Sequence, residues 1–333
     1  MSSSAATTMK CAITGALSYS GRYLAASLLN KGHDVVNLSR RGVPIAQQPL
    51  SAPQARSLGT HRVRLDVSNV AAMARSLEGC DVLFSTYWVR FADRGGDNPH
   101  AIAAANCEIL WEAAKLAGVQ KILMASHTRT SLESPFPYIA GKAKAEAALR
   151  NSGVNYAIVR PCGIFGDTAQ ESILMNNAAW VLRRSPLFLL AGDGSHKFQP
   201  VHVRDIAELM EELGTSRGTS GEEVDACGPD APTSLELFTK LRDACGGLAR
   251  VAPVGNLLST STITALTKPI DCLTGDTLLD ADDLDLLTSG LTRANVADDP
   301  RIQARRSLFE WMEARGRDLG RNYVSSVERY YSN

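Results

Sequence analysis

The first half of the chain alternates short apolar runs with longer segments whose apolar residues recur at helical spacing. Such alternation is typical of parallel strands joined by crossover helices. The apolar runs that we expect to be strands span residues 10–14, 34–39, 62–67, 81–86, 121–126 and 156–160. Helices are expected at residues 22–31, 70–77 and 101–116, each followed by a glycine suited to a left-handed C-cap. The pattern predicts an α/β fold with a doubly wound parallel sheet.

The second half of the chain follows a different pattern. Beyond Gly166 it becomes irregular and mostly helical, with strands expected near residues 198–203 and 222–226. We therefore expect residues 1–166 to form the main sheet domain, joined by a further strand near 198–203, and residues 167–333 to form a smaller, mostly helical lobe. Residues 42–59 are polar, contain proline and fit neither period, so a loop is expected there.

A glycine-containing segment, TGALSYSG at residues 14–21, lies directly between the first expected strand and the first expected helix. In that context it indicates a dinucleotide-binding Rossmann fold, with a tight turn without ligand as the alternative. Gly15 permits the turn, Gly21 permits close packing of the helix on the strand, and the N–H groups of the helix start suit a pyrophosphate. Ser18 replaces the central glycine, so its hydroxyl either crowds the phosphates or donates to them. The residues expected to contact the cofactor here are Thr14, Gly15, Leu17, Ser18, Tyr19, Ser20 and Gly21.

The end of the second expected strand indicates which cofactor is bound. NAD-preferring proteins carry a carboxylate there for the ribose hydroxyl, but no acidic residue lies between Val35 and Leu65. Instead Arg40 and Arg41 follow the strand, and guanidinium groups suit a 2′-phosphate. We therefore expect the protein to prefer NADP(H), although binding of NAD(H) stays open. The alternative for Arg40 and Arg41 is that they are a solvated basic pair without a role in binding.

Two further strand ends carry candidate cofactor residues. Asp66 and Val67 end the third expected strand and are expected near the adenine ring, although Asp66 also suits the N-cap of the next helix. Ser85 and Thr86 end the fourth strand and are also expected at the cofactor.

Tyr138 and Lys142 begin the helix after the fifth expected strand, and their spacing of four places both on one helix face. A tyrosine acts as an acid or base near neutral pH only if its phenolate is stabilised, which a neighbouring ammonium does. The pattern alone also suits an ordinary amphipathic helix end. Ser126 and Thr128, on either side of His127, are the hydroxyl candidates for orienting a carbonyl oxygen, and Ser126 suits a turn at the strand end equally well.

These motifs, together with RPCGIFG at residues 160–166 and QPVHVRD at residues 199–205, resemble the short-chain dehydrogenase/reductase superfamily, particularly its extended and atypical members. The resemblance covers nearly the whole chain. It is strongest to the atypical group that includes NAD(P)-binding epimerase/dehydratase-like proteins and the nucleotide-binding accessory subunit of respiratory complex I.

The resemblance also implies roles for particular residues. It implies that Tyr138 is the acid/base, and that Lys142 holds the nicotinamide ribose while stabilising the phenolate. It further implies that the segment with Pro161, Gly163 and Ile164 shapes the nicotinamide end.

Residues beside this expected site are candidates for substrate contact. Tyr87, Trp88 and Arg90 follow the fourth expected strand, where they line a substrate pocket or pack a long loop against the core. Asn177, on the expected helix after Gly166, is a further candidate. The histidines and cysteines show no metal-ligand spacing, so no metal is expected.

Two functions from different classes fit these residues. The first is an NADP(H)-dependent oxidoreductase or epimerase/dehydratase-like enzyme, in which hydride passes at the nicotinamide while Tyr138 exchanges a proton with a small carbonyl or hydroxyl substrate. The second is a non-catalytic NADPH-binding structural or sensory protein, such as a complex I accessory subunit or an NmrA-like regulator.

The composition of the chain argues against nucleic acid and membrane as partners. Thirty-five basic and thirty-five acidic residues cancel, so no overall field attracts nucleic acid, and no apolar run approaches the roughly 18 residues of a membrane span. Seven scattered cysteines without a C-x-x-C pair favour a reducing compartment. We expect a cytoplasmic location, with a mitochondrial one as the alternative, and a chain that acts alone, as a homo-oligomer or within a larger complex.

Overall fold

The computed structural model describes residues 8–39, 48–89, 98–216, 218, 220–255, 257–274, 276, 281–294 and 305–325. The chain divides into two compact units. Unit 1 comprises Met1–Arg160 and Ile206–Asp225, and unit 2 comprises Pro161–Asp205 and Ala226–Asn333. The chain therefore returns to unit 1 after its first passage into unit 2, a return that the sequence pattern did not indicate. Each unit is described by itself below.

Unit 1 is built on a six-stranded sheet with the order β2-β1-β3-β4-β5-β9. The strands are β1 (Lys10–Thr14), β2 (Asp34–Leu38), β3 (Val82–Ser85), β4 (Lys121–Ala125), β5 (Asn155–Pro161) and β9 (Glu222–Ala226). Neighbouring strands from β2 to β5 pair in parallel, and the order reverses at β1, which lies between β2 and β3. The expected doubly wound α/β fold is confirmed, and the loop after β1 lies where such sheets bind nucleotides.

The expected strand at residues 62–67 is wrong. Val63 makes a single bridge with Leu38 at the end of β2, through hydrogen bonds of 2.9 Å to the Asn37 carbonyl and 3.0 Å from the Ser39 amide. Apolar Val63 and Leu65 alternate here with the exposed residues Arg62 and Arg64, so only two side chains are available to anchor the segment. The sixth strand of the sheet is instead β9, which comes from the second half of the chain.

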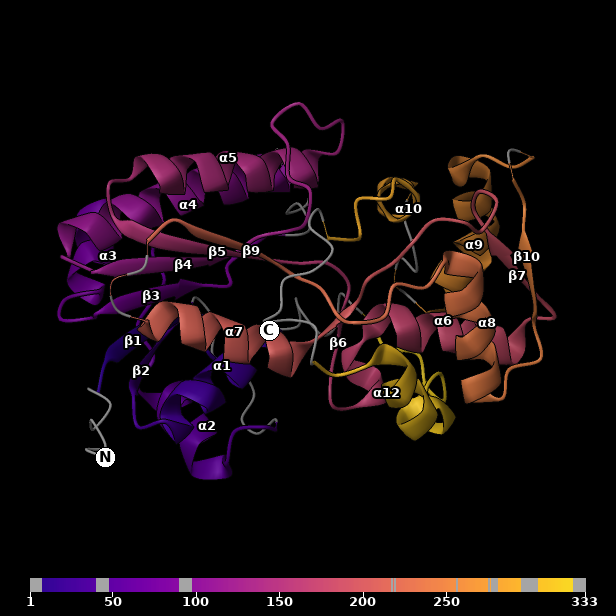
Figure 1. Ribbon diagram of the computed structural model, residues 1–333, viewed down its shortest axis with the longest axis horizontal. Coiled ribbons are helices and arrows are strands. Elements are labelled where there is room, and N and C mark those ends of the chain that lie inside the picture. Colours follow the sequence, from indigo (N-terminus) through magenta and orange to yellow (C-terminus); the bar gives the residue numbers. More distant parts are fainter. Residues whose placement is uncertain are drawn as a thin grey trace. The chain divides into compact units, whose positions relative to one another are not determined.

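Helices cover both faces of this sheet (Figure 1). α3 (Val70–Ser76), α4 (Pro99–Leu116) and α5 (Pro137–Asn151) lie on one face, and α1 (Tyr19–Asn30) and α7 (Val203–Thr215) lie on the other. α7 packs closely because Gly214 leaves room for Phe84 of β3, whose ring would lie 2.3 Å from a Cβ there. An ion pair between Lys31 and Glu211 joins α1 to α7.

Helix α2 (Ala52–Thr60) corrects the loop expected at residues 42–59, of which 42–47 lie outside the described residues. Its first turn is stabilised by a capping box, in which Ser51 accepts from the Gln54 amide and the Gln54 side chain accepts from the Ser51 amide. Pro53 stands in the first turn, where a missing N–H is tolerated. The sequence S-x-x-Q with this proline was the signal that could have predicted the helix.

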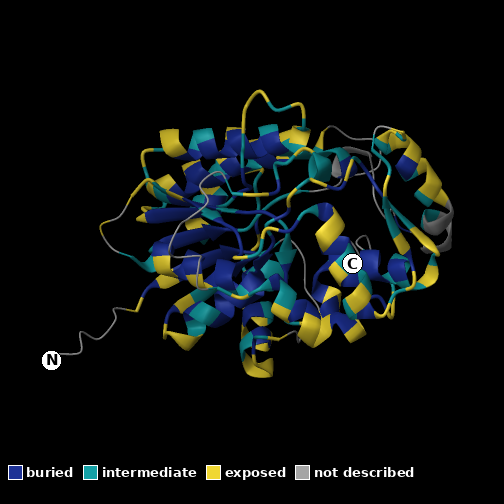
Figure 2. Cartoon of the chain, turned by 45° about the vertical axis from the view of Figure 1, so that its right-hand side comes forward, coloured by how far each residue is buried: buried dark blue, intermediate teal, exposed yellow. Residues whose placement is uncertain are grey.

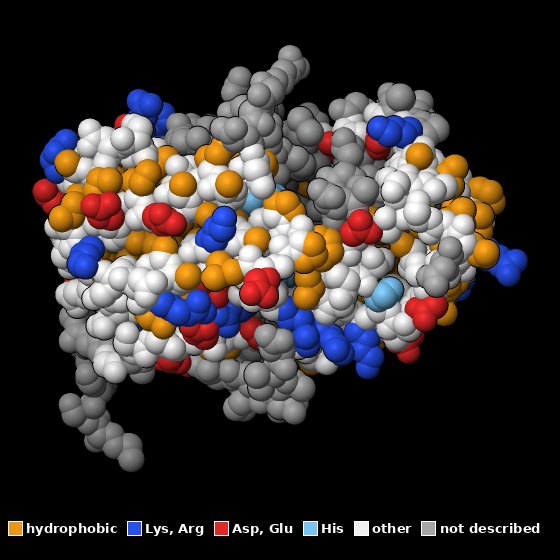
Figure 3. Space-filling view, turned by 90° about the horizontal axis from the view of Figure 1, so that it is seen from above, with side chains coloured by type: hydrophobic (Ala, Val, Ile, Leu, Met, Phe, Trp, Pro, Cys, Tyr) orange, Lys and Arg blue, Asp and Glu red, His pale blue; other side chains and the backbone are white. Residues whose placement is uncertain are grey.

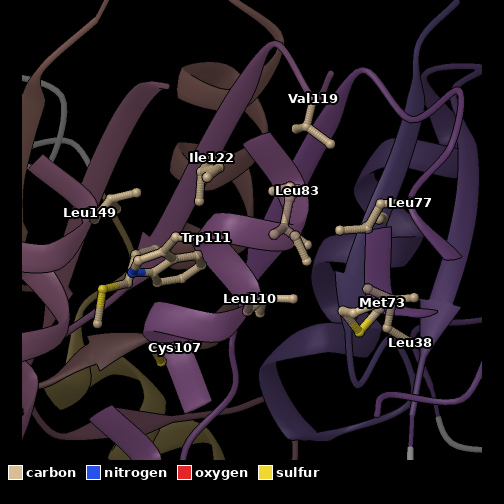
Figure 4. Packing of buried hydrophobic residues seen from close by; sticks show 14 of the residues in the cluster. Leu38, Met73, Leu77, Leu83, Cys107, Leu110, Trp111, Val119, Ile122 and Leu149 are labelled. Atoms are coloured by element: carbon tan, nitrogen blue, oxygen red, sulfur yellow. The ribbon is translucent and has the colours of Figure 1, made fainter. Parts of the chain in front are cut away.

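The core of unit 1 fills the space between the sheet and α3, α4 and α5. Figure 4 shows Trp111 with Leu110, Ile122 and Leu149 around it. Its indole N–H donates to the Ala145 carbonyl at 3.2 Å, so α4 and α5 are tied by a polar contact inside an apolar cluster. The strands are mostly buried (Figure 2).

Unit 2 contains two small parallel sheets, one of β6 (Ile164–Phe165) with β8 (Val201–His202) and one of β7 (Leu187–Leu190) with β10 (Arg250–Pro253). The strand expected near 198–203 is thus only the short β8, whereas the strand expected at 222–226 forms as β9. The helices of unit 2 are α6 (Ile173–Arg184), α8 (Ser234–Cys245), α9 (Thr260–Thr274), α10 (Ala281–Thr288) and α12 (Leu308–Arg315), with the 3-10 turns Ala169–Glu171 and Gly316–Asp318. Trp311 anchors its core and donates to the Gly166 carbonyl at 2.6 Å.

Acidic and basic side chains both occur on the face seen in Figure 3, in line with the balanced composition. None of the helices in the described ranges is long and apolar enough to cross a membrane.

Candidate nucleotide site and Tyr138 cluster

The loop between β1 and α1 is shaped by its glycines. Gly15 has a φ of 72°, a conformation that side chains rarely adopt, and its amide donates to the Leu38 carbonyl at 2.7 Å. Gly21 faces the same turn, and a Cβ there would lie 2.0 Å from the Gly15 carbonyl oxygen. Ala16 donates to the Asn37 side chain at 2.9 Å, which fixes the loop against β2. The loop is therefore a close-packed turn that only glycine permits at residues 15 and 21.

Ser18, which replaces the central glycine, is the N-cap of α1. Its side-chain oxygen accepts from the Gly21 amide at 3.3 Å, and the residue is exposed. Because the oxygen accepts in this bond, the hydroxyl hydrogen can still be donated outward. Leu17, Tyr19 and Ser20 are half-buried around it. The tight turn, the exposed hydroxyl and the N-terminus of a helix together fit a dinucleotide pyrophosphate.

Thr14 and Thr86 fasten the ends of β1 and β3 to each other. The Thr86 amide donates to the Thr14 hydroxyl at 2.9 Å, and the Thr86 hydroxyl donates to the Thr14 carbonyl at 2.7 Å. The adjacent Ser85 is buried. These bonds hold the two strand ends on which the nucleotide loop rests, and direct contact of these residues with a cofactor stays a prediction.

The adenosine end of the expected site is described only in part. Arg40 and Arg41 lie outside the described residues. Asp66 does not cap the next helix: its carboxylate accepts from the Ser68 amide at 3.1 Å and from the Ser68 hydroxyl at 2.6 Å. The N-cap of α3 is Asn69. Asp66 thus closes a local turn, and Val67 beside it is half-buried.

Tyr138 lies in the first turn of α5, half-buried, within an aromatic cluster. Its ring meets the rings of Trp88, His100 and His127 at steep angles, with centroid distances of 5.9, 5.3 and 5.4 Å. Trp88 follows β3, His100 lies in the first turn of α4, and His127 follows β4. We call Trp88, His100, His127 and Tyr138 the Tyr138 cluster. Edge-to-face contacts of this kind hold the tyrosine ring in a fixed orientation.

Hydrogen bonds determine which nitrogens of the two histidines carry protons. Trp88 donates its indole N–H to Nδ1 of His100 at 3.2 Å, so this Nδ1 is unprotonated and the Nε2 of His100 carries the proton. His127 Nδ1 lies 2.8 Å from the Thr128 carbonyl, which only accepts, so this Nδ1 carries the proton. In its neutral form His127 therefore presents Nε2 as an acceptor. Tyr138 is flanked by one histidine with a donor Nε2 and one with an acceptor Nε2.

Lys142 is buried one turn along the same helix. Its ammonium donates to the Ala125 carbonyl at 2.9 Å and lies 4.0 Å from the centre of the Trp88 ring, against 6.0 Å for the Tyr138 ring. Burial lowers the pKa of Lys142 to about 8, against the opposing influence of Cys107 and Glu146. The lysine is therefore held by Trp88 and by the end of β4, rather than directly by the tyrosine.

Gly141, between Tyr138 and Lys142, makes this arrangement possible. A Cβ at this position would lie 2.9 Å from the His100 carbonyl oxygen and 3.3 Å from the Trp88 ring. The glycine thus lets both Trp88 and α4 approach the face of α5 that carries Tyr138 and Lys142. No feature of the sequence had marked it.

The hydroxyl residues after β4 are both buried. The Ser126 hydroxyl has no hydrogen-bond partner among the described residues. The buried Glu146 carboxyl has a lowered pKa: burial raises it, but hydrogen bonds of 2.9 and 2.7 Å from Arg160 outweigh burial. Thr128 is fully buried. His127, not a hydroxyl, is the residue of this segment whose ring contacts Tyr138.

The remaining candidates divide between several places. Tyr87 accepts from Asn106 at 2.8 Å and packs on the core, and Arg90 lies outside the described residues. Asn177, in unit 2, accepts from the Val324 amide at 3.0 Å and donates to the Val324 carbonyl at 2.9 Å. A substrate contact by Asn177 would require that segment to move.

Pro161, Gly163 and Ile164 belong to unit 2, and their part in cofactor binding stays a prediction. Sequence reasoning missed two residues beside Tyr138: His100, which belongs to the Tyr138 cluster, and Gly141, which lets Trp88 and α4 approach α5. A histidine in the first turn of a helix has no local signature, whereas His127 was visible as the break between two hydroxyl residues.

Comparison with known proteins agrees with the nucleotide-binding fold of unit 1. Residues 15–180 match the model of the NAD(P)H-binding family, and this part of the chain belongs to that family. The expected resemblance to atypical and extended short-chain dehydrogenases/reductases is confirmed. The chain is therefore an NAD(P)H-binding Rossmann protein with an oxidoreductase- or epimerase-like fold.

Among curated relatives, the chain is 26% identical over 253 residues to subunit 9 of the NADH dehydrogenase [ubiquinone] 1 alpha subcomplex, mitochondrial, of Dictyostelium discoideum, covering 73% of this chain and 66% of that protein. It is 25% identical over 239 residues to the subunit of the same name from Arabidopsis thaliana, covering 69% and 56%. The matched region thus spans less than two thirds of these relatives.

Solved structures share the fold. An NADPH-dependent quinone oxidoreductase from Escherichia coli, complexed with NADPH, matches with a TM-score of 0.67 and 21% identity, covering 91% of this chain and 99% of that one. A nucleoside-diphosphate-sugar epimerase from Staphylococcus aureus matches with a TM-score of 0.68 and 17% identity, covering 92% and 100%.

Proposed function

We propose that this protein is an NADP(H)-dependent reductase that reduces a small carbonyl substrate, with Tyr138 as the proton donor. The observation that carries the proposal is the Tyr138 cluster, in which a half-buried phenol at a helix start is flanked by two histidines with opposite proton arrangements. Such a residue set suits proton exchange, which a protein that only binds a nucleotide does not need.

Bound NADPH would supply the hydride in such a reaction. The chain's own residues supply the proton: Tyr138 donates its hydroxyl proton to the developing alkoxide. The rings of His100 and His127, whose centroids lie 5.3 and 5.4 Å from that of Tyr138, hold the phenol ring in place. Lys142 acts from a distance, because an ammonium 6.0 Å from the ring centre stabilises a negative charge there by roughly 3 kcal/mol at an effective dielectric constant of about 20.

The cofactor side of the proposal rests on the β1–α1 loop and on the two arginines after β2. We propose that the loop and Ser18 hold the pyrophosphate and that Arg40 holds the 2′-phosphate of NADPH. Thermal unfolding with NADPH, NADH or no cofactor tests this on the wild type and on Arg40→Ala. A stabilisation by NADPH that is selective and lost in the variant supports the assignment, and equal stabilisation by both dinucleotides refutes the preference.

The catalytic side is tested by NADPH oxidation with a panel of quinones, aldehydes and ketones. Loss of a general acid lowers the rate typically by 10²–10⁴-fold, so we expect this loss for Tyr138→Phe. Tyr156→Phe is the matched control, because Tyr156 lies in β5 beside Gly221, outside the cluster. Equal rates for wild type and Tyr138→Phe would refute Tyr138 as the acid.

A non-catalytic NADPH-binding role is the second candidate. Trp88 favours it, because its ring covers the ammonium that would otherwise face a nicotinamide ribose. Some relatives are named as mitochondrial NADH dehydrogenase subunits. Under this second candidate we therefore propose that the chain is a subunit of a mitochondrial complex and not a cytoplasmic enzyme. Selective stabilisation by NADPH without turnover of any panel member would favour this role over the first.

A further inference from the structure

Two cysteines lie together in unit 2, and one of them, Cys162, belongs to the segment that is expected to shape the nicotinamide end. The Sγ atoms of Cys162 and Cys227 are 3.6 Å apart, and both residues are buried in unit 2. Cys162 is the first residue after β5, and Cys227 is the first after β9. Because β5 and β9 are neighbours in the sheet, their ends bring the two thiols together although 65 positions separate them in the sequence.

The backbone around the pair is held on several sides. Cys162 donates its thiol to the Gln199 carbonyl, and the Gln199 side chain donates to the Gly228 carbonyl at 3.0 Å. Gly228 donates to the Pro200 carbonyl at 3.1 Å, and a Cβ on Gly228 would lie 2.2 Å from that oxygen. The proximity of the thiols is thus imposed by three backbone segments in tight contact and does not depend on the cysteine rotamers alone.

We propose that Cys162 and Cys227 are a site of oxidative modification at which peroxides or small disulfides form an intramolecular disulfide. With a peroxide, the O–O bond breaks as one sulfur becomes a sulfenic acid, and the second sulfur then attacks it and expels water. Each thiol gives up one hydrogen, and hydrogen peroxide yields two waters in all. With oxidised glutathione, the same bond forms by two exchanges that release two glutathione thiols.

The distances allow this bond. A disulfide has an S–S length of about 2.05 Å, so the sulfurs must approach by roughly 1.5 Å, which rotation of the two side chains can supply. Holding both thiols in place raises their effective concentration for the second, ring-closing step over that of free glutathione. Cys245 offers a contrast, because it is also buried but donates its thiol at 3.4 Å to the Arg242 carbonyl of its own helix.

The experiment uses the full-length protein, equilibrated in glutathione buffers of rising oxidised fraction, quenched in acid, denatured and alkylated. Peptide mass spectrometry of the wild type is expected to show a cross-linked pair of peptides that contain Cys162 and Cys227, with the other cysteines alkylated. Cys162→Ser and Cys227→Ser each remove the cross-link, whereas Cys245→Ser retains it.

Alkylation of both Cys162 and Cys227 at the most oxidising ratio would overturn the proposal. So would glutathione attached separately to either cysteine without a cross-link. Both results come from the wild type alone, so the test stands even if a serine variant fails to fold. None of these outcomes depends on whether the protein turns over NADPH.

Discussion

The burial of Lys142 makes a sharp prediction about how stability depends on pH. Its ammonium is almost fully enclosed, and burial lowers the pKa of this group from 10.5 to about 8. Below pH 8 the lysine is protonated in both the folded and the unfolded chain. Between pH 8 and 10.5 the unfolded chain keeps a proton that the folded chain has released, so raising the pH through this window stabilises the folded state.

The size of the effect follows from these pKa values. Each pKa unit corresponds to 1.36 kcal/mol, so the full shift is worth about 3 kcal/mol. Between pH 7 and pH 9 the linkage relation gives a gain of about 1.3 kcal/mol for the wild type. Lys142→Met removes this ionisation and fills the space under Trp88 with an apolar side chain. The hydrogen bond to Ala125 and the contact with Trp88 are lost at both pH values and therefore cancel.

The measurement is equilibrium unfolding in urea at pH 7 and pH 9, on the wild type and on Lys142→Met. We expect the free energy of unfolding of the wild type to rise by about 1.3 kcal/mol relative to the variant between the two pH values. Lys144→Met, on the exposed side of the same helix, is the control and should show no such change. An identical pH dependence for wild type and Lys142→Met would refute the burial of the ammonium.

Three further predictions follow from single contacts. Gly21→Ala places a Cβ 2.0 Å from a backbone oxygen, so it should lower the free energy of unfolding by about 3 kcal/mol or more, the upper end for overpacking, and abolish stabilisation by NADPH. Gly59→Ala is the control: the nearest atom to its Cβ lies at 3.8 Å, so thermal unfolding should be nearly unchanged. Hydrogen bonds from Arg150 and Arg160 lower the pKa of Glu223 to about 2, so its stabilisation is present above pH 4.5 and lost as the pH falls toward 2. Glu223→Gln should cost roughly 1–2 kcal/mol in urea unfolding at pH 7 and less than half of that at pH 3, and an equal cost at both would contradict it. Asn177→Ala should cost about 2 kcal/mol and expose the chain around Val324 to proteolysis, and an unchanged cleavage pattern there would show that this amide does not hold the segment.

The sequence by itself determined the elements whose signals are local. Strand β1, the glycines at residues 15 and 21 and the helix that begins near Tyr138 were all predicted, because apolar runs, tight turns and residues spaced four apart leave traces within a few residues. The class of fold followed, since alternating strands and helices form a parallel sheet. The capping box that starts α2 is also a local signal, so helix α2 could have been predicted from the sequence.

Only the tertiary structure decided which distant residues meet. It reduced the expected strand at residues 62–67 to a single bridge beside β2, and it set β9, from the second half of the chain, at the other edge of the sheet beside β5. The edges of a sheet are chosen by packing and not by local propensity. The tertiary structure also placed His100 beside Tyr138, set Lys142 under Trp88 and brought Cys162 to Cys227. These contacts join segments far apart in the chain, and their energies depend on burial and on the groups around them. No pattern within a short stretch of sequence carries that information.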